Sequence, residues 1–306
     1  MDSGNIGFVL LCAAFVFVMT PGLAMFYGGL VRKKNVVNTM MTSIFIIGFG
    51  YSLSFAPSGN AFIGDFRWLG LEGVSLTEGY TDGASIPNMV FSAFQMMFAV
   101  ITPALITGAV AGRMKFKSIF VFTIFWSLIV YYPLAHMVWG QGGLLGADGI
   151  GALDFAGGDV VHISSGVSAL VLCILLGKRH DYEHSIYRIH NIPTVVLGAS
   201  LLMFGWFGFN AGSALAADGL AAHAFMTTGV SAAAAMLSWM LCDVIKNKKP
   251  TLIGASTGMV AGLVGITPGA GFVPMWAAVI IGLTTSPVCY IMISYGKKKF
   301  GFDDAL

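Results

Sequence analysis

Charged residues are scarce in this sequence of 306 residues: they make up 10 % of it, against about 25 % in an average soluble domain. Hydrophobic residues make up 57 %, and the mean hydropathy is +0.82. So few charges cannot make the surface of a globule polar, which excludes soluble enzymes, nucleic-acid-binding proteins and disordered proteins. The composition predicts an all-α polytopic membrane protein.

Cysteines and targeting signals are also few. The four cysteines lie in apolar stretches without paired spacing, which favours small core residues over a disulfide or metal role. The start, MDSGNIGFVLLCAAF, has no basic region and no small-residue cleavage site, so we expect a retained first span. No span holds an H-E-x-x-H motif or paired acids, and neither an enzyme nor a cofactor is expected.

Nine apolar segments, separated by charged or turn-rich breaks, are each about as long as a membrane-spanning helix requires. They cover residues 6–31, 36–57, 86–111, 117–138, 159–177, 191–212, 222–245, 251–268 and 274–295. The longer connections, 58–85 and 139–158, are too short to form a separate domain. We therefore predict one membrane domain over residues 1–306.

The basic residues predict the orientation of these spans. Of the 16 lysines and arginines, 15 follow an odd-numbered span, and only Arg67 lies elsewhere. Since loops rich in lysine and arginine stay in the cytoplasm, the N-terminus is predicted outside and the C-terminus inside. A missed or invented span would disrupt this alternation.

Acidic residues gather in the predicted external loops: Asp65, Glu72, Glu78, Asp82, Asp148 and Asp218. Ordinary loop solubility explains such a face. A mild attraction for cations near a vestibule is the alternative.

One histidine is predicted inside a span, where ionisable groups are costly and informative. His162 lies about two turns into the segment 159–177, with Ser164 and Ser165 as its close polar neighbours. Imidazole can donate one hydrogen bond and accept another, which suits a polar path for a small, weakly basic solute. Asp159 is placed to cap or charge-stabilise the same helix, whereas Asp154 could either stabilise an external cation or bind loop amides.

Aromatic residues and one serine stand out in or beside three spans: Phe94, Phe98, Trp139, Trp206, Phe209 and Ser213. Interfacial anchoring of tryptophan and packing of phenylalanine would explain them. Alternatively, an aromatic cage could bind a cation and lead to a dry constriction that excludes hydrated ions.

Three further histidines, His180, His184 and His190, lie in a basic loop predicted to be cytoplasmic. Their spacing resembles that of metal ligands, but no apolar pocket surrounds them in sequence. We interpret them as solvated loop residues and predict no metal site.

Glycine is abundant, with 40 residues, many of them inside predicted spans. Small residues let helix backbones approach closely in lipid, where no hydrophobic force drives helices together. The spacings Gly205-x-x-Gly208-x-x-x-Gly212 and Gly258-x-x-x-Gly262 therefore predict tight helix contacts.

Six runs, taken in their order along the chain, closely resemble the ammonium transporter (Amt/Mep/Rh) family. They are TPGLAMFYGGLVRKKNV, FQMMFAVITPALITGAVAGRMKF, AHMVWGQGG, LDFAGGDVVHISSG, GWFGFNAGSA and KKPTLIGASTGMVAGLVGITPGAG. The resemblance covers essentially the whole chain. It implies a homotrimer in the cell membrane with one narrow pore per subunit, built from two inverted halves, here about 1–180 and 190–306.

The resemblance also implies roles for residues. Trp139, Phe98 and Ser213 match the external ammonium recruitment site, and Asp154 matches the buried acid that supports it. Ammonium or ammonia is then the substrate, membrane lipid surrounds the chain, and a cytoplasmic PII-type nitrogen-regulatory protein is the expected partner.

Below the recruitment site, Phe98 and Phe209 match the family's stacked phenyl gate, and His162 matches the first of two pore histidines. The family continues through D-D-x-x-D to a second histidine on a tenth span, whereas this sequence ends at FGFDDAL. The resemblance therefore implies a C-terminally truncated chain, and transport would need the missing pore wall. The alternative function is an ammonium sensor, a role that usually carries an added signalling domain.

Overall fold

The computed structural model describes residues 1–30, 46–57, 60–147, 149–178 and 191–302, and this part of the chain is helical without a strand. Six helices are regular over most of their length: α1 (Ser3–Leu30), α4 (Asn88–Val110), α8 (Ile192–Gly212), α9 (Gly219–Asn247), α10 (Leu252–Ile266) and α11 (Met275–Ile291). Others join through π-helical turns: η1 (Ile46–Gly50) with α3 (Tyr51–Phe55), α5 (Phe116–Trp126) with η3 (Ser127–Tyr131) and α6 (Tyr132–Trp139), η4 (Gly158–Ile163) with α7 (Ser164–Leu176), and η6 (Met292–Gly296) with α12 (Lys297–Phe300). Short 3₁₀ turns lie at η2 (Leu69–Leu71) and η5 (Thr267–Gly269).

Eight helices in the described residues are long and apolar enough to cross a membrane, and they coincide with eight of the nine predicted spans. The other predicted span, 36–57, begins among residues outside the described part, which shows only η1 and α3. The all-α, multi-span prediction is thus confirmed, while the count of nine stays a prediction.

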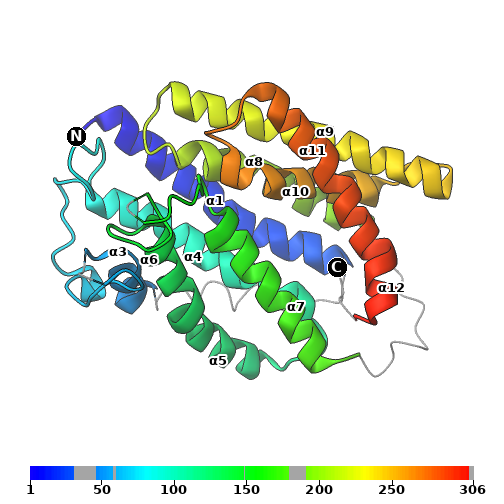
Figure 1. The fold of residues 1–306 in the computed structure, drawn as a ribbon, viewed down its shortest axis with the longest axis horizontal. Helices are drawn as coiled ribbons and strands as arrows, with labels where there is room; N and C mark the ends of the chain where they lie inside the picture. Colours follow the sequence, from blue (N-terminus) through cyan, green and yellow to red (C-terminus); the bar gives the residue numbers. More distant parts are fainter. Residues whose placement is uncertain (31–45, 58–59, 148, 179–190, 303–306) are drawn as a thin grey trace.

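The helices form one bundle (Figure 1), and the residues at its two ends differ in charge. At the end where α4 and α7 finish, Arg113 Nη1 donates to the Gly177 carbonyl at 2.7 Å. The ends of α9 and α11 also meet, because Lys246 Nζ lies 4.8 Å from the ring centroid of Tyr295. We call this the basic end; the positive-inside rule predicts that it faces the cytoplasm.

The opposite end carries the acidic loops, and we call it the acidic end. Asp218 caps the start of α9 by accepting from Ala221 N, and Glu78 O accepts from Asn88 N at the start of α4. Arg67 pairs with Asp65 at 2.6 Å, and the hydrogen bonds from Arg67 lower the pKa of the Asp65 carboxyl. This pair offsets part of the negative charge.

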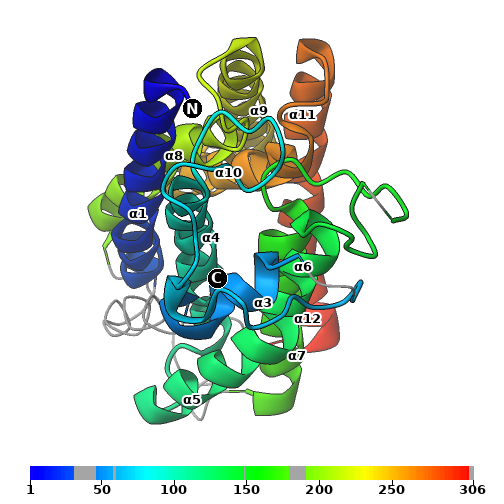
Figure 2. The same ribbon diagram turned by 90° about the vertical axis from the view of Figure 1, so that its left-hand side faces the viewer.

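Helix α4 connects the two sides of the bundle. In Figure 2, α1, α8, α9, α10 and α11 occupy the upper part, while α3, α5, α6 and α7 lie below them. Helix α4 packs against both α1 and α7, so residues on its inner face meet side chains from both parts.

Glycines bring α1 and α8 into close contact, which agrees with the tight helix contacts predicted from the glycine spacing. A Cβ at Gly208 would lie 2.7 Å from Phe15 Cβ, and one at Gly212 would lie 2.6 Å from Cys12 Cβ. The second glycine pair is also confirmed, since a Cβ at Gly258 would lie 2.5 Å from Trp239 Cβ on α9. Backbone proximity thus replaces side-chain interdigitation at both contacts.

We predict that Gly198→Ala destabilises the protein. Its Cβ would lie 2.6 Å from the Gly22 carbonyl oxygen and overlap the Phe26 backbone, and backbone cannot give way as a side chain can. Overpacking of this kind costs about 1–3 kcal/mol. The melting temperature in detergent should fall, whereas Gly7→Ala on α1, with open space around its Cβ, should leave it equal or higher. Equal melting temperatures for the two variants would contradict the packing.

Candidate functional site

Asp154 organises the loop between α6 and η4. The residue is 8 % exposed, and its Oδ1 accepts from the backbone N–H groups of Gly157 and Gly158, both at 2.6 Å. Its Oδ2 accepts from Asp159 N at 2.8 Å and Val160 N at 3.1 Å. Of the two alternatives open from the sequence, the structure shows that this carboxylate binds loop amides. It also caps the helix that Asp159 was expected to cap.

The same loop holds the tryptophan. Trp139 Nε1 donates to the Asp154 carbonyl oxygen at 3.0 Å, which fixes the indole at the end of α6. Gly157, with φ of 112°, makes the turn that brings the backbone under the carboxylate, a conformation that favours glycine. Asp154 thus positions the indole and the first turn of η4 together.

Phe98 and Phe209 meet in the middle of the bundle. Their ring centroids are 4.3 Å apart at 36°, and the two side chains are 1 % and 0 % exposed. Trp139 lies edge-on to Phe98 with centroids 5.9 Å apart. Three helices, α4, α6 and α8, therefore supply rings that leave no room for a hydrated ion at this point.

His162 lies on the other side of Phe209. Its ring stacks on Trp206, with centroids 5.4 Å apart, and on Phe209 at 6.0 Å. Its Nε2 is buried and has no hydrogen-bond partner among the described residues. The neighbouring hydroxyls of Ser164 and Ser165 bond to backbone carbonyls instead. A buried ring nitrogen without a partner is available to a solute.

Ser213 lies at the C-terminal end of α8, one helical turn after Phe209. Its hydroxyl donates to the Phe209 carbonyl at 2.9 Å at the end of α8. In the described residues, no hydrogen bond or ring contact joins Ser213 to Trp139. The ring contacts thus join Trp139, Phe98, Phe209 and His162, and Ser213 follows Phe209 by one helical turn toward the acidic end.

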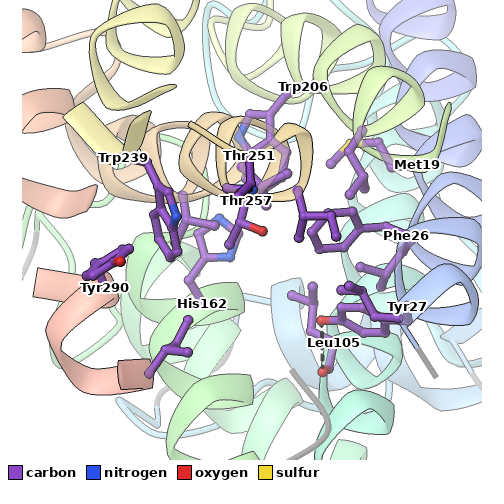
Figure 3. Close-up of a pocket in the computed structure, with 18 of the residues that line it drawn as sticks. Met19, Phe26, Tyr27, Leu105, His162, Trp206, Trp239, Thr251, Thr257 and Tyr290 are labelled. Carbon is purple, nitrogen blue, oxygen red and sulfur yellow. Dashed lines mark hydrogen bonds between the residues drawn. The ribbon is translucent and has the colours of Figure 1, made fainter. Parts of the chain in front are cut away.

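A cavity of about 530 Å³ extends from His162 toward the basic end of the bundle. Trp206, Phe209 and His162 line it near the phenyl pair, and Trp239 and Tyr290 line it farther on. Figure 3 shows Trp239 and Tyr290 across this space from Phe26 and Tyr27. The passage therefore widens beyond the rings.

Two features of the site were not predicted from the sequence: the hydrogen bond of Thr267 and the stacking of Trp206 on His162. Thr267 Oγ1 accepts from Trp206 Nε1 at 2.9 Å and so orients the indole that stacks on His162. Trp206 was noted as an aromatic residue without a link to His162, since 44 positions separate them. Only the packing of η4 against α8 and α10 reveals the pair.

One sequence pattern lacks catalytic geometry in the described residues. Residues 254–258 read GASTG and match G-x-S-x-G, but Ser256 lies within α10 and donates to Leu252 O, whereas a hydrolase serine occupies a strand-to-helix turn. His180, His184 and His190 fall outside the described residues. Within the described ranges, no group of three metal-ligating side chains is present.

Comparison with known proteins identifies the family. A family model described as the Ammonium Transporter Family matches residues 7–306. The chain is 52 % identical over 315 residues to the ammonium transporter of Bacillus subtilis, covering all of this chain and 76 % of that protein. The chain belongs to the ammonium transporter family. The expectation from the six runs is confirmed, and with eight apolar helices this family member is a multi-pass membrane protein.

Other relatives of this ammonium transporter family member agree. A putative ammonium transporter of Methanothermobacter thermautotrophicus is 45 % identical, with all of this chain and 76 % of that protein covered. The crystal structure of Saccharomyces cerevisiae Mep2 matches with a TM-score of 0.90 at 39 % identity, covering 99 % of this chain and 71 % of that one. The fold is therefore that of the Mep2 structure over the matched length.

Proposed function

We propose that this protein transports ammonium across the cell membrane by way of Trp139, the Phe98–Phe209 pair and His162. The observation that carries the proposal is the alignment of an indole, a dry ring pair and an unpartnered imidazole nitrogen toward one cavity. Relatives named ammonium transporters, matched over the whole chain, support ammonium as the substrate.

The ring pair dictates the form in which the solute passes. A cation can rest on the face of Trp139, where the ring quadrupole attracts it. It cannot keep its water between two rings 4.3 Å apart, and a bare charge is costly at membrane depth. The cation therefore gives one proton to water on the acidic side and crosses as ammonia, to which His162 Nε2 offers one hydrogen bond. Water on the basic side returns a proton to the ammonia.

In this proposal, Asp154 holds other groups in position and does not contact the substrate itself. All four hydrogen bonds to its carboxylate come from backbone N–H groups, so it acts on the substrate through Trp139 and η4. Ser213, placed in the recruitment site by the family resemblance, donates its hydroxyl proton to Phe209 O, which leaves the lone pairs of its oxygen free to accept from an ammonium ion.

The assembly expected from the family is also part of the proposal: a homotrimer of pores surrounded by lipid, with a PII-type regulatory protein on the basic side. Apolar side chains on the outside of α7 and α11, such as Leu175 and Trp276, fit lipid or a neighbouring subunit. The mass of the protein in a native mass spectrum tests the trimer, which is expected at three chains.

Trp139→Leu tests the recruitment step. Loss of cation–π attraction, about 0.5–2 kcal/mol, should raise the half-saturating concentration for labelled methylammonium uptake by about 2- to 30-fold. Trp276→Leu is the matched control, because that indole is 67 % exposed on α11 and lies outside the passage. Equal half-saturating concentrations in the two variants would contradict recruitment at Trp139.

A further inference from the structure

Asp243 is a buried carboxylate that the proposed transport path does not use. It lies on α9 near the basic end, is 4 % exposed and lines the cavity that begins at His162. Its Oδ2 accepts from Thr251 N at 3.1 Å and Thr251 Oγ1 at 2.7 Å, at the start of α10. Its Oδ1 accepts from Asn247 Nδ2 at 3.2 Å, and a side-chain hydrogen bond also joins the carboxylate to Tyr290. All of these donors are neutral groups, so none of them supplies a positive charge.

No basic side chain of the described residues forms an ion pair with Asp243. The described ion pair is the one between Arg67 and Asp65 at the acidic end. Lys246, one turn beyond Asp243 and also on the cavity wall, lies instead over the rings of Tyr290 and Tyr295. A carboxylate that is buried without a counter-ion favours a cation in the adjoining space.

Aromatic rings beside Asp243 complete a site for an ammonium group. Trp239, one turn before Asp243, lies edge-on to Tyr290 with centroids 5.4 Å apart, and both rings line the cavity. The Lys246 ammonium already lies 5.4 Å from the centroid of Tyr290. This part of the wall thus holds a tethered alkylammonium group in the structure, next to an unpaired carboxylate.

We propose that Asp243, together with Trp239 and Tyr290, forms a second cation site at the basic end of the cavity, which binds ammonium and small primary alkylammonium ions. The tethered ammonium of Lys246 competes for it. The site rests on the proposed function insofar as its ligand reaches it through the passage from His162. A solute would then meet an aromatic cation site at each end of a dry path.

Transport measured separately from the two ends tests this site. Uptake is measured in sealed vesicles of the two opposite orientations. Asp243→Asn keeps an acceptor for Thr251 but removes the charge. For uptake from the basic end it should raise the half-saturating methylammonium concentration at least about tenfold, and for uptake from the acidic end it should change that concentration less than twofold. Lys246→Met should lower the basic-end value about threefold. Asp218→Asn, a cap at the other end of α9, should change neither value.

A binding measurement separates this inference from the transport proposal. At constant ionic strength, methylammonium chloride should raise the melting temperature of the detergent-solubilised wild type above its value in sodium chloride, and raise that of Asp243→Asn by less than half as much. Stabilisation that depends on Asp243 without any saturable flux would overturn transport and keep the site. Equal stabilisation of both proteins, or an Asp243→Asn effect of equal size from the two ends, would overturn the site.

Discussion

Replacing Asp154 by alanine is expected to abolish methylammonium uptake and to lower the melting temperature of the protein. Four backbone N–H groups at the start of η4 bond to this one carboxylate. Each buried N–H left without an acceptor costs about 1–3 kcal/mol, so the loop cannot keep its conformation in the variant. Trp139, bonded to the Asp154 carbonyl, and His162, at the end of η4, both lose their positions.

Asp159→Asn is the matched control for this loss. Asp159 is five residues away on the same turn and takes part in these contacts only through its backbone N–H. Uptake and melting temperature of the control should stay near those of the wild type. An Asp154→Ala protein that transports methylammonium as the wild type does would show that the loop geometry is not needed.

The second large effect is expected for His162→Ala, which should lower the maximal uptake rate by about 10- to 100-fold. Its Nε2 offers the polar contact next to the phenyl pair, and an ammonia molecule left without that contact in a dry passage loses about 1–3 kcal/mol. The measurement is the initial rate of labelled methylammonium uptake at saturating concentration.

His223→Gln provides the comparison for this histidine. His223 Nε2 lies 2.8 Å from the Val273 carbonyl, away from the cavity, and glutamine can donate to the same oxygen. Its uptake rate should match that of the wild type. Unchanged uptake in His162→Ala would remove this residue from the path.

Features set by short stretches of sequence were predictable. Runs of apolar residues predicted eight helices at their observed places, because a span needs a fixed length of apolar chain. The glycine spacings predicted close helix contacts, which the structure has between α8 and α1, since backbone approach follows from local spacing. The motif runs predicted the family, which the comparisons confirm.

Features made by packing distant segments could not be predicted. The cation-stabilising and amide-binding roles of Asp154 remained open because only the folded turn at Gly157 shows which donors face the carboxylate. The stacking of His162 on Trp206 needs α8 and η4 side by side. Asp243 was part of an apolar segment in the sequence, and the cavity beside it exists only where several helices meet.

Potassium competition tests the central claim most directly, because potassium has nearly the size and charge of ammonium but no proton to give up. Labelled methylammonium uptake is measured in liposomes that contain the protein and in empty liposomes, with unlabelled ammonium or potassium added at equal concentrations. The account predicts saturable uptake above that of empty liposomes, blocked by ammonium and not by potassium. Uptake equal to that of empty liposomes, or equal block by the two ions, would contradict it.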